Sequence, residues 1–233
     1  IDHDSVDMGP DNESIYRNTD WFDEQIHKPL KAAGLDYRIE ISWSNHWQKA
    51  IMHAAKKIGA TRILIRAGKP KTSRRFAFTE NKWKLFKRAF CPVILVRDGA
   101  APARKVVLAA VNFQAVRDQQ QQLNSNILAR GQSLAENYGA EFHVVNAYLD
   151  SMLYPDRGRL AKETRLNSSN IHVVQGYTDE AIGKVANDIG ADVVVIGTLG
   201  QTGMVKTRRG NTAERVISAL EVDVVVINSE YKS

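Results

Sequence analysis

One stretch of the chain places glycines at a spacing that suits the binding of a phosphate. The apolar run at residues 193–196 leads into Gly197 and Gly200, and Gly210 precedes a second apolar pattern. Glycine lets the backbone approach a ligand closely, and the exposed N–H groups at a helix start attract an anion. Ligands of open α/β sheets bind beyond the carboxyl ends of the strands, where we expect this loop. The alternative is a tight strand-to-helix turn that needs glycine without any ligand.

The residues after Gly210 indicate a helix start and not a catalytic group. Asn211 and Glu214 have the spacing of an N-cap residue and the glutamate that bonds back to it. The loop lacks the Gly-Lys-Ser/Thr end of a Walker A motif and the spacing of the dinucleotide fingerprint. No Gly-x-Ser-x-Gly motif and no Cys–His arrangement indicates a nucleophile, so we do not expect an enzyme.

The hydrophobic pattern predicts the elements that position this loop. Short β-branched runs are typical of strands buried on both faces, and apolar residues at 3.6-residue spacing predict amphipathic helices. Because strands and helices alternate, we expect an α/β fold with a doubly wound parallel sheet, helices on both faces and right-handed crossovers. The predicted strands are residues 106–111, 142–145, 193–196 and 224–227, and the predicted helices are residues 117–138, 179–189 and 211–220.

The pattern occurs twice in the chain. Residues 58–65 match residues 189–196, and residues 93–96 match residues 224–227, both at a distance of 131 positions. A single ungapped offset that aligns separate strands and the helix before them indicates an internal repeat. The chain therefore contains two diverged copies of one α/β module.

The repeat predicts the domain boundaries. We expect an N-terminal module at residues 1–98, a linker at residues 99–104 that is rich in small residues and proline, and a C-terminal module at residues 105–233. A helix near residues 14–33 precedes the matched part of the first module. The counterpart of Val106 falls before residue 1, so we expect the first module to be incomplete at its N-terminus.

The glycine spacing resembles a known signature. Gly197-x-x-Gly200, nine residues and Gly210 are similar to the G-x2-G-x9-G-(S/T) signature of ATP-binding universal stress proteins. The continuation Asn-Thr-Ala-Glu-Arg-Val and the closing strand resemble the tandem, E-type members of that family. The resemblance covers residues 105–232 and, more weakly, residues 14–97. It implies the universal stress protein fold, a cytoplasmic role in stress survival, and pairing of the two modules within the chain, with a homodimer as an extension of that contact.

The resemblance also implies a site for an adenine nucleotide such as ATP. In ATP-binding relatives the ends of the first and second strands and the glycine loop hold the ligand. By position these are Ala110, Val111, Asn112, Val144, Val145, Ile196, Gly197, Leu199, Gly200, Gly210, Asn211 and Thr212. Two residues depart from the family pattern: Asn211 replaces Ser or Thr, and Asn112 replaces an aspartate and so lacks its anionic acceptor. The alternative is a non-nucleotide scaffold or interaction protein in which both sites are degenerate.

The first copy has lost the glycine loop. The counterparts of Gly197, Gly200 and Gly210 are Arg66, Lys69 and Thr79. Side chains therefore stand where a phosphate approaches the backbone. We predict that the N-terminal module does not bind ATP in the manner of the family.

Composition narrows the class of protein further. The 233 residues carry a net charge of +6 and one cysteine, Cys91, which excludes an internal disulfide and fits a reducing cytoplasm. No apolar run approaches the roughly 20 residues of a transmembrane helix, and the acidic, polar start does not resemble a signal peptide. We expect a cytoplasmic protein with no membrane partner.

Two further groups of residues have types that could form binding sites. The basic segment 66–88 could contact an anionic partner such as a nucleic acid. However, Trp83, Phe86 and Phe90 have helical spacing, which favours a helix with these residues facing the core and its lysines facing solvent. Residues 69–78 lack this helical spacing, so contact with an anionic or protein partner stays an alternative for them. His46 and His53 have no third ligand at a suitable spacing, so we expect no metal site.

Overall fold

The computed structural model describes residues 19–42, 44–67, 80–100, 103–199, 212–229 and 231. The chain forms two compact units, Ile1–Ser42 and Trp43–Ser233. The first unit contains a continuous helical stretch made of α2 (Thr19–Phe22), a π-helical segment (Asp23–His27) and α3 (Lys28–Ala32). The helix predicted near residues 14–33 is therefore confirmed where the structure describes it.

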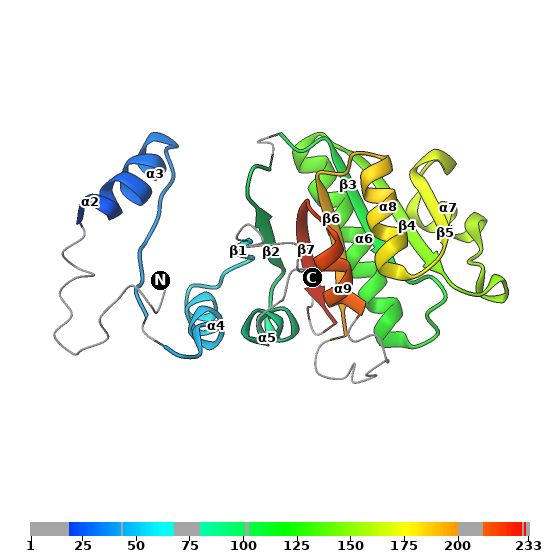
Figure 1. Ribbon diagram of the computed structural model, residues 1–233, viewed down its shortest axis with the longest axis horizontal. Coiled ribbons are helices and arrows are strands. Elements are labelled where there is room, and N and C mark those ends of the chain that lie inside the picture. Colours follow the sequence, from blue (N-terminus) through cyan, green and yellow to red (C-terminus); the bar gives the residue numbers. More distant parts are fainter. Residues whose placement is uncertain are drawn as a thin grey trace. The chain divides into compact units, whose positions relative to one another are not determined.

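The second unit is built on one seven-stranded sheet (Figure 1). Its strand order is β1-β2-β7-β6-β3-β4-β5. All neighbours are parallel except β2 and β7, which are antiparallel. The strands are β1 (Ile63–Ala67), β2 (Val93–Arg97), β3 (Val106–Val111), β4 (Glu141–Tyr148), β5 (Ile171–Gln175), β6 (Val193–Thr198) and β7 (Asp223–Asn228).

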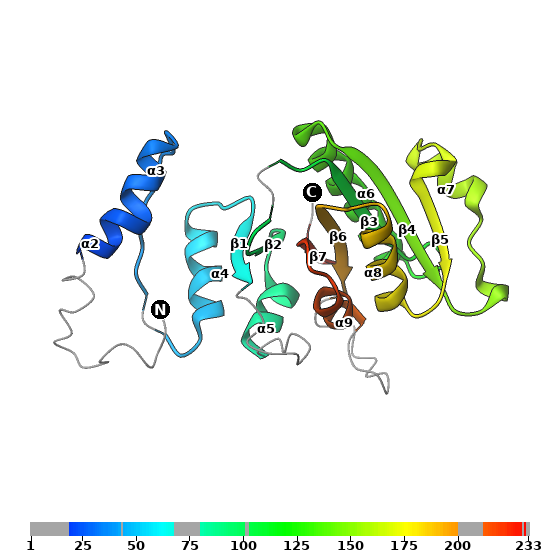
Figure 2. The same cartoon turned by 45° about the horizontal axis from the view of Figure 1, so that its top comes forward.

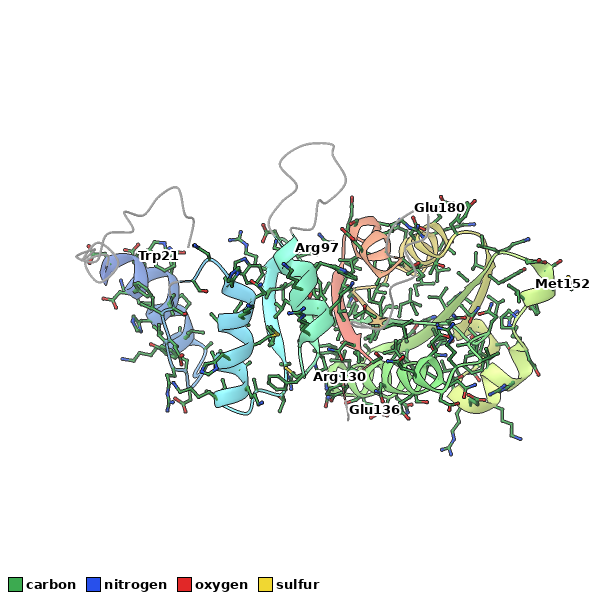
Figure 3. All side chains as sticks on the ribbon, turned by 90° about the horizontal axis from the view of Figure 1, so that it is seen from below. Trp21, Arg97, Arg130, Glu136, Met152 and Glu180 are labelled. Carbon is green, nitrogen blue, oxygen red and sulfur yellow. The ribbon has the colours of Figure 1, made fainter. Side chains whose placement is uncertain are left out.

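Helices cover both faces of this sheet, as predicted. One core contains residues of α4 (Trp47–Lys57), α5 (Glu80–Arg88), α8 (Thr178–Asp188) and α9 (Thr212–Ala219). A second core, on the other face, contains residues of α6 (Asp118–Tyr138) and α7 (Arg157–Thr164). Figure 2 shows α4, α5, α9 and α8 in that order along the sheet. In Figure 3, Glu136 on α6 and Glu180 on α8 lie on opposite sides.

The helices and strands repeat at the predicted distance of 131 positions. The bounds of α4 map onto those of α8, and the last residue of α5 maps onto that of α9. The strand register is preserved as well, because Ile63 pairs with Val93 and its counterpart Val194 pairs with Val224. The two copies therefore share helices, strands and register.

The two copies meet along β2 and β7, with Val93 opposite Val226 and Leu95 opposite Val224. Arg97 on β2 donates from Nη2 to the carbonyls of Ile217 at 2.8 Å and Leu220 at 2.7 Å, at the end of α9 (Figure 3). These bonds satisfy carbonyl groups that a helix end leaves without partners.

The repeat counterpart of Arg97 makes the reciprocal contact at this junction. Asn228 donates to the carbonyl of Ala89, directly after α5. Ala89 and Leu220 hold the same position in the repeat. The junction is therefore close to two-fold symmetric, with each closing strand capping the last helix of the other copy.

Sequence reasoning missed or misjudged parts of this unit. Strand β5 and helix α7 were not predicted, and β4 extends beyond the predicted residues 142–145. The expectation that Phe90 belongs to the core face of a helix is wrong. Helix α5 ends at Arg88, and Phe90 is 41% exposed because Ala89 and Cys91 take the buried places. The domain boundaries at residues 98 and 105 stay a prediction.

Candidate phosphate-binding site

The fold brings three of the predicted segments to one edge of the sheet. Strand β3 lies between β6 and β4 and is parallel to both, so their carboxyl ends meet there. Ala110 pairs with Val145, and Val111 with Asn146. Thr212 begins α9, which follows β6 along the chain. Gly200, Gly210 and Asn211 lie outside the described residues.

At most of the described site residues, only backbone groups are available to a ligand at this edge. Val144 and Val145 are fully buried and belong to the cores on opposite faces of the sheet. Ile196 is buried in the same core as Val145. Asn112 and Thr212, in contrast, are exposed. Any ligand at this edge would therefore contact backbone groups and a small number of polar side chains.

Gly197 has a structural reason to be glycine. A Cβ at this position would lie 2.7 Å from Leu123 Cδ2 and 2.8 Å from Ile127 Cδ1, both on α6. Helix α6 thus packs directly onto the end of β6. A side chain at residue 197 would force the helix or those two side chains to move.

Two asparagines that sequence reasoning did not single out shape this edge. Asn124 on α6 accepts from the backbone N–H of Asn112 at 3.0 Å and donates to its carbonyl at 2.7 Å. The backbone of Asn112 is therefore tied to α6. The position of Asn112 at the strand end is held by a side chain twelve residues further along the chain.

The second, Asn146, is fully buried near the end of β4. Its Oδ1 accepts from the N–H of Phe113 at 2.6 Å, and its Nδ2 donates to Gln114 Oε1 at 3.1 Å. Gln114 in turn donates to the carbonyl of Leu153 at 3.0 Å. The amides fix the loop between β3 and α6 over the end of β4. The sequence signal that could have found Asn146 is an amide directly after the apolar pair Val144 and Val145, within a strand.

In the first copy, an ion pair occupies the position of the first glycine. Arg66 donates from Nε to Asp98 Oδ1 at 2.7 Å, and its side chain is 79% exposed. The hydrogen bond to Asp98 and the charge of that carboxylate raise the pKa of Arg66. Lys69 and Thr79 lie outside the described residues.

A separate polar cluster lies at the opposite edge, near the starts of β4 and β5. Nδ1 of His143 lies 3.1 Å from Nε2 of His172, and Nε2 of His143 lies 3.3 Å from Glu141 Oε2. The two imidazole rings are stacked. Burial lowers the pKa of His172, the positive charges of His143 and Arg157 lower it further, and Asp188 opposes them.

The other candidates do not form a site among the residues that the structure describes. His53 is exposed on α4 and His46 precedes that helix. No group of three metal-ligating side chains occurs in the described ranges. Over the same ranges, no helix has both the length and the apolar character to cross a membrane. Cys91 is buried, and burial raises the pKa of its thiol.

Comparison with known proteins decides the family. The chain is similar to Universal stress protein E of Escherichia coli K12, with 30% identity over 239 aligned residues that cover 93% of this chain and 75% of that protein. The chain belongs to the universal stress protein family. A homolog of Universal stress protein E from Haemophilus influenzae is 32% identical over an alignment that covers 66% of this chain and 58% of that protein. The profile of the Universal stress protein family matches residues 155–228.

Solved structures agree on the fold. A protein of unknown function from Pseudomonas aeruginosa PAO1 superposes with a TM-score of 0.74 at 24% identity, covering 94% of this chain and 79% of that one. A universal stress protein from Archaeoglobus fulgidus gives a TM-score of 0.68 at 16% identity, covering 96% and 82%. The predicted family and the α/β fold with two modules are therefore confirmed.

Proposed function

We propose that this universal stress protein acts in the stress response as a nucleotide-responsive binding protein of the cytoplasm. Its second copy binds ATP or another adenine nucleotide at the edge formed by the ends of β3, β4 and β6 and the start of α9. The observation that carries this proposal is the convergence of those strand ends in the copy that keeps Gly197, Gly200 and Gly210.

Several features support a nucleotide at this edge. Gly197 lies near the end of β6, a strand buried within the sheet, and α9 offers the N–H groups of a helix start to an anion. The amide network around Asn146 and Asn124 holds the loop after β3 in place without a ligand. A preorganised edge loses little entropy when a ligand binds.

Calorimetry with matched variants tests this proposal. We expect ATP or ADP to release binding heat with the intact chain. We expect Gly200→Val to abolish this heat, because a side chain at residue 200 would fill the space in which the phosphate approaches the backbone. Lys69→Val is the control, since Lys69 holds the same repeat position in the first copy. We expect Lys69→Val to bind like the unmodified chain. If the unmodified chain shows no heat at roughly millimolar nucleotide, the proposal of a nucleotide site is wrong.

The second candidate function is a scaffold without a nucleotide. It is favoured by Asn112 and Asn211, which depart from the family pattern, and by Gly197, whose lack of a side chain is explained by α6 alone. This candidate predicts that the purified protein releases no nucleotide on denaturation. Mass spectrometry of the supernatant checks this, and an adenine nucleotide recovered in proportion to protein excludes the scaffold.

A further inference from the structure

Exposed apolar side chains gather in the loops that follow β3, β4 and β5, at the carboxyl edge of the sheet. The two most exposed large hydrophobic side chains of the described ranges lie here, since Met152 is 90% exposed and Val116 is 85% exposed. Figure 3 shows Met152 pointing away from the strands. A single exposed apolar residue is ordinary, whereas a connected group marks a binding surface. The group, which we call the apolar rim, consists of Val116, Leu149, Met152, Leu153, Tyr154 and Tyr177.

Side-chain hydrogen bonds join the loops of the apolar rim. Gln114 donates from Nε2 to the carbonyl of Leu153 at 3.0 Å, which ties the loop that carries Val116 to the loop after β4. Gln175, at the end of β5, donates from Nε2 to the carbonyl of Leu149 at 3.4 Å. The loops after β3, β4 and β5 therefore form one connected surface and not three separate tips.

The backbone of this surface is already used within the chain. The carbonyls of Leu149 and Leu153 accept from the two glutamines, and the carbonyl of Tyr148 accepts from the N–H of Gly176 at 2.9 Å. A docking strand binds through main-chain hydrogen bonds, so it would have to replace these bonds. A helix satisfies its own backbone and contacts a partner through side chains alone. The apolar rim therefore fits a helix with an apolar face.

The apolar rim has an acidic border. Arg159 pairs with Glu163 at 2.7 Å, and Arg157 donates to two backbone carbonyls at 2.9 and 3.0 Å, so both arginines have partners within the chain. Arg117 adds one positive charge to the border. The border is net negative, although the whole chain carries a net charge of +6. Its exposed acidic residues are Asp118, Asp150, Asp156 and Glu180.

We propose that the apolar rim docks a basic amphipathic helix of another protein. The apolar face of that helix packs on the exposed side chains around Met152 and Val116, and its cations meet the acidic border. Because the rest of the chain is positively charged, it repels such a helix and confines the complementary surface to this edge. The proposal does not rest on the nucleotide site, since its residues follow the strand ends and do not include the glycine loop.

A labelled peptide tests the apolar part of the docking surface. The probe is a helix of about 18 residues with leucine on one face and lysine on the other. Fluorescence anisotropy should show saturable binding to the unmodified chain. The double variant Val116→Ser/Met152→Ser should bind the peptide at least about tenfold more weakly, because truncating central apolar contacts removes most of the binding energy. Tyr138→Ser, at an exposed tyrosine outside the rim, is the control and should bind like the unmodified chain.

Neutral variants test the acidic border. Asp118→Asn/Glu180→Gln should weaken binding about three- to tenfold, and the difference should shrink as salt is added, because exposed charges are screened. Glu136→Gln/Glu221→Gln removes two exposed carboxylates outside the border and should leave the affinity unchanged. Thermal midpoints should agree across these variants, since every substituted residue is exposed.

Three results would overturn the proposal. The first is a peptide that fails to bind the unmodified chain or binds the Val116→Ser/Met152→Ser variant equally well. The second is equal binding of a peptide of the same composition whose leucines are spread around the helix, because the surface then does not select an apolar face. The third is a chain that associates with itself through Val116 and Met152 in sedimentation equilibrium and ignores the peptide, since the occupant is then a second copy.

Discussion

Ile94 lies directly opposite Val225 where β2 meets β7, and the two residues hold the same position in the repeat. The approximate two-fold axis therefore passes between them. Residues on either side of this pair contact each other's counterparts, which explains why Arg97 and Asn228 make reciprocal caps. The junction between the modules is continuous sheet, stabilised by hydrogen bonds from both copies.

The first prediction concerns Asp223, whose carboxylate joins two arginines at this junction. It accepts from the N–H of Arg97 at 2.8 Å and from Arg104 at 2.6 Å, and its side chain is only 6% exposed. We expect Asp223→Ala to lower the free energy of unfolding by about 3 kcal/mol, because the guanidinium of Arg104, whose side chain is only 15% exposed, is left without its partner. Urea denaturation measures this. Glu221→Ala, at an exposed neighbour, should change stability by less than about 0.5 kcal/mol.

The second prediction concerns the close packing of α6 at the end of β6. Gly197→Ala should lower the free energy of unfolding by about 1–3 kcal/mol, because the added Cβ would lie within 2.8 Å of Leu123 and Ile127. Gly183→Ala is the matched control. A Cβ at residue 183 in α8 lies no closer than 3.9 Å to the atoms around it, and alanine favours a helix by about 1 kcal/mol. Equal effects of the two substitutions on the denaturation midpoint would contradict this account of Gly197.

The third prediction concerns the pair His143 and His172. The pKa of His172 lies below its ordinary value of 6.5, so between these values the unfolded chain binds more protons than the folded chain. The stabilisation is complete above pH 6.5 and is lost as the pH falls through the window below it. We expect the free energy of unfolding to fall as the pH drops below about 6.5, and His172→Gln to reduce that fall.

The control for this pH dependence is His53→Gln, which changes an exposed histidine on α4. It should leave the slope of stability against pH unchanged. Denaturant midpoints measured at several pH values distinguish the variants. A slope that does not change in His172→Gln would refute a role for the histidine pair.

The fourth prediction concerns Asn112 and rests on the proposed nucleotide site. The hydrogen bonds from Asn124 reach the backbone of Asn112, so an aspartate there keeps them. We expect Asn112→Asp to tighten binding of an adenine nucleotide about three- to tenfold, because an anionic acceptor makes stronger hydrogen bonds with ligand donors. Asn137→Asp adds the same charge at the other end of α6 and should leave the calorimetric affinity unchanged.

The sequence allowed the repeat and most of the sheet to be predicted, because buried strands are locally apolar. The offset of 131 residues was sufficient to identify α4, β1 and β2 as the repeat counterparts of α8, β6 and β7. Strand β5 was missed since it lies at the edge of the sheet and three of its five residues are only partly buried, which leaves no continuous apolar run. Phe90 was misjudged because spacing alone does not reveal where a helix ends.

The candidate site was only partly visible for a different reason. The glycines can be found from their spacing, but the amides that hold the edge act across the chain. Asn146 bonds to a residue 33 positions away, and Asn124 to one 12 positions away. Nor does spacing explain why residue 197 is a glycine. The explanation is helix α6, which precedes Gly197 in the chain and packs closely against it. Contacts of this kind follow from the fold and not from any local pattern.

The antiparallel contact between β2 and β7 has a consequence for how the two copies have diverged. When two modules pair inside one chain, their association is set by an effective concentration of about millimolar and does not depend on how much protein is present. Identical subunits must also carry the same residue at both ends of a shared surface. Fusion removes that constraint. Lys49 and Glu180 could take opposite charges, and one glycine loop could be lost while the other was kept, without weakening the pairing of the modules.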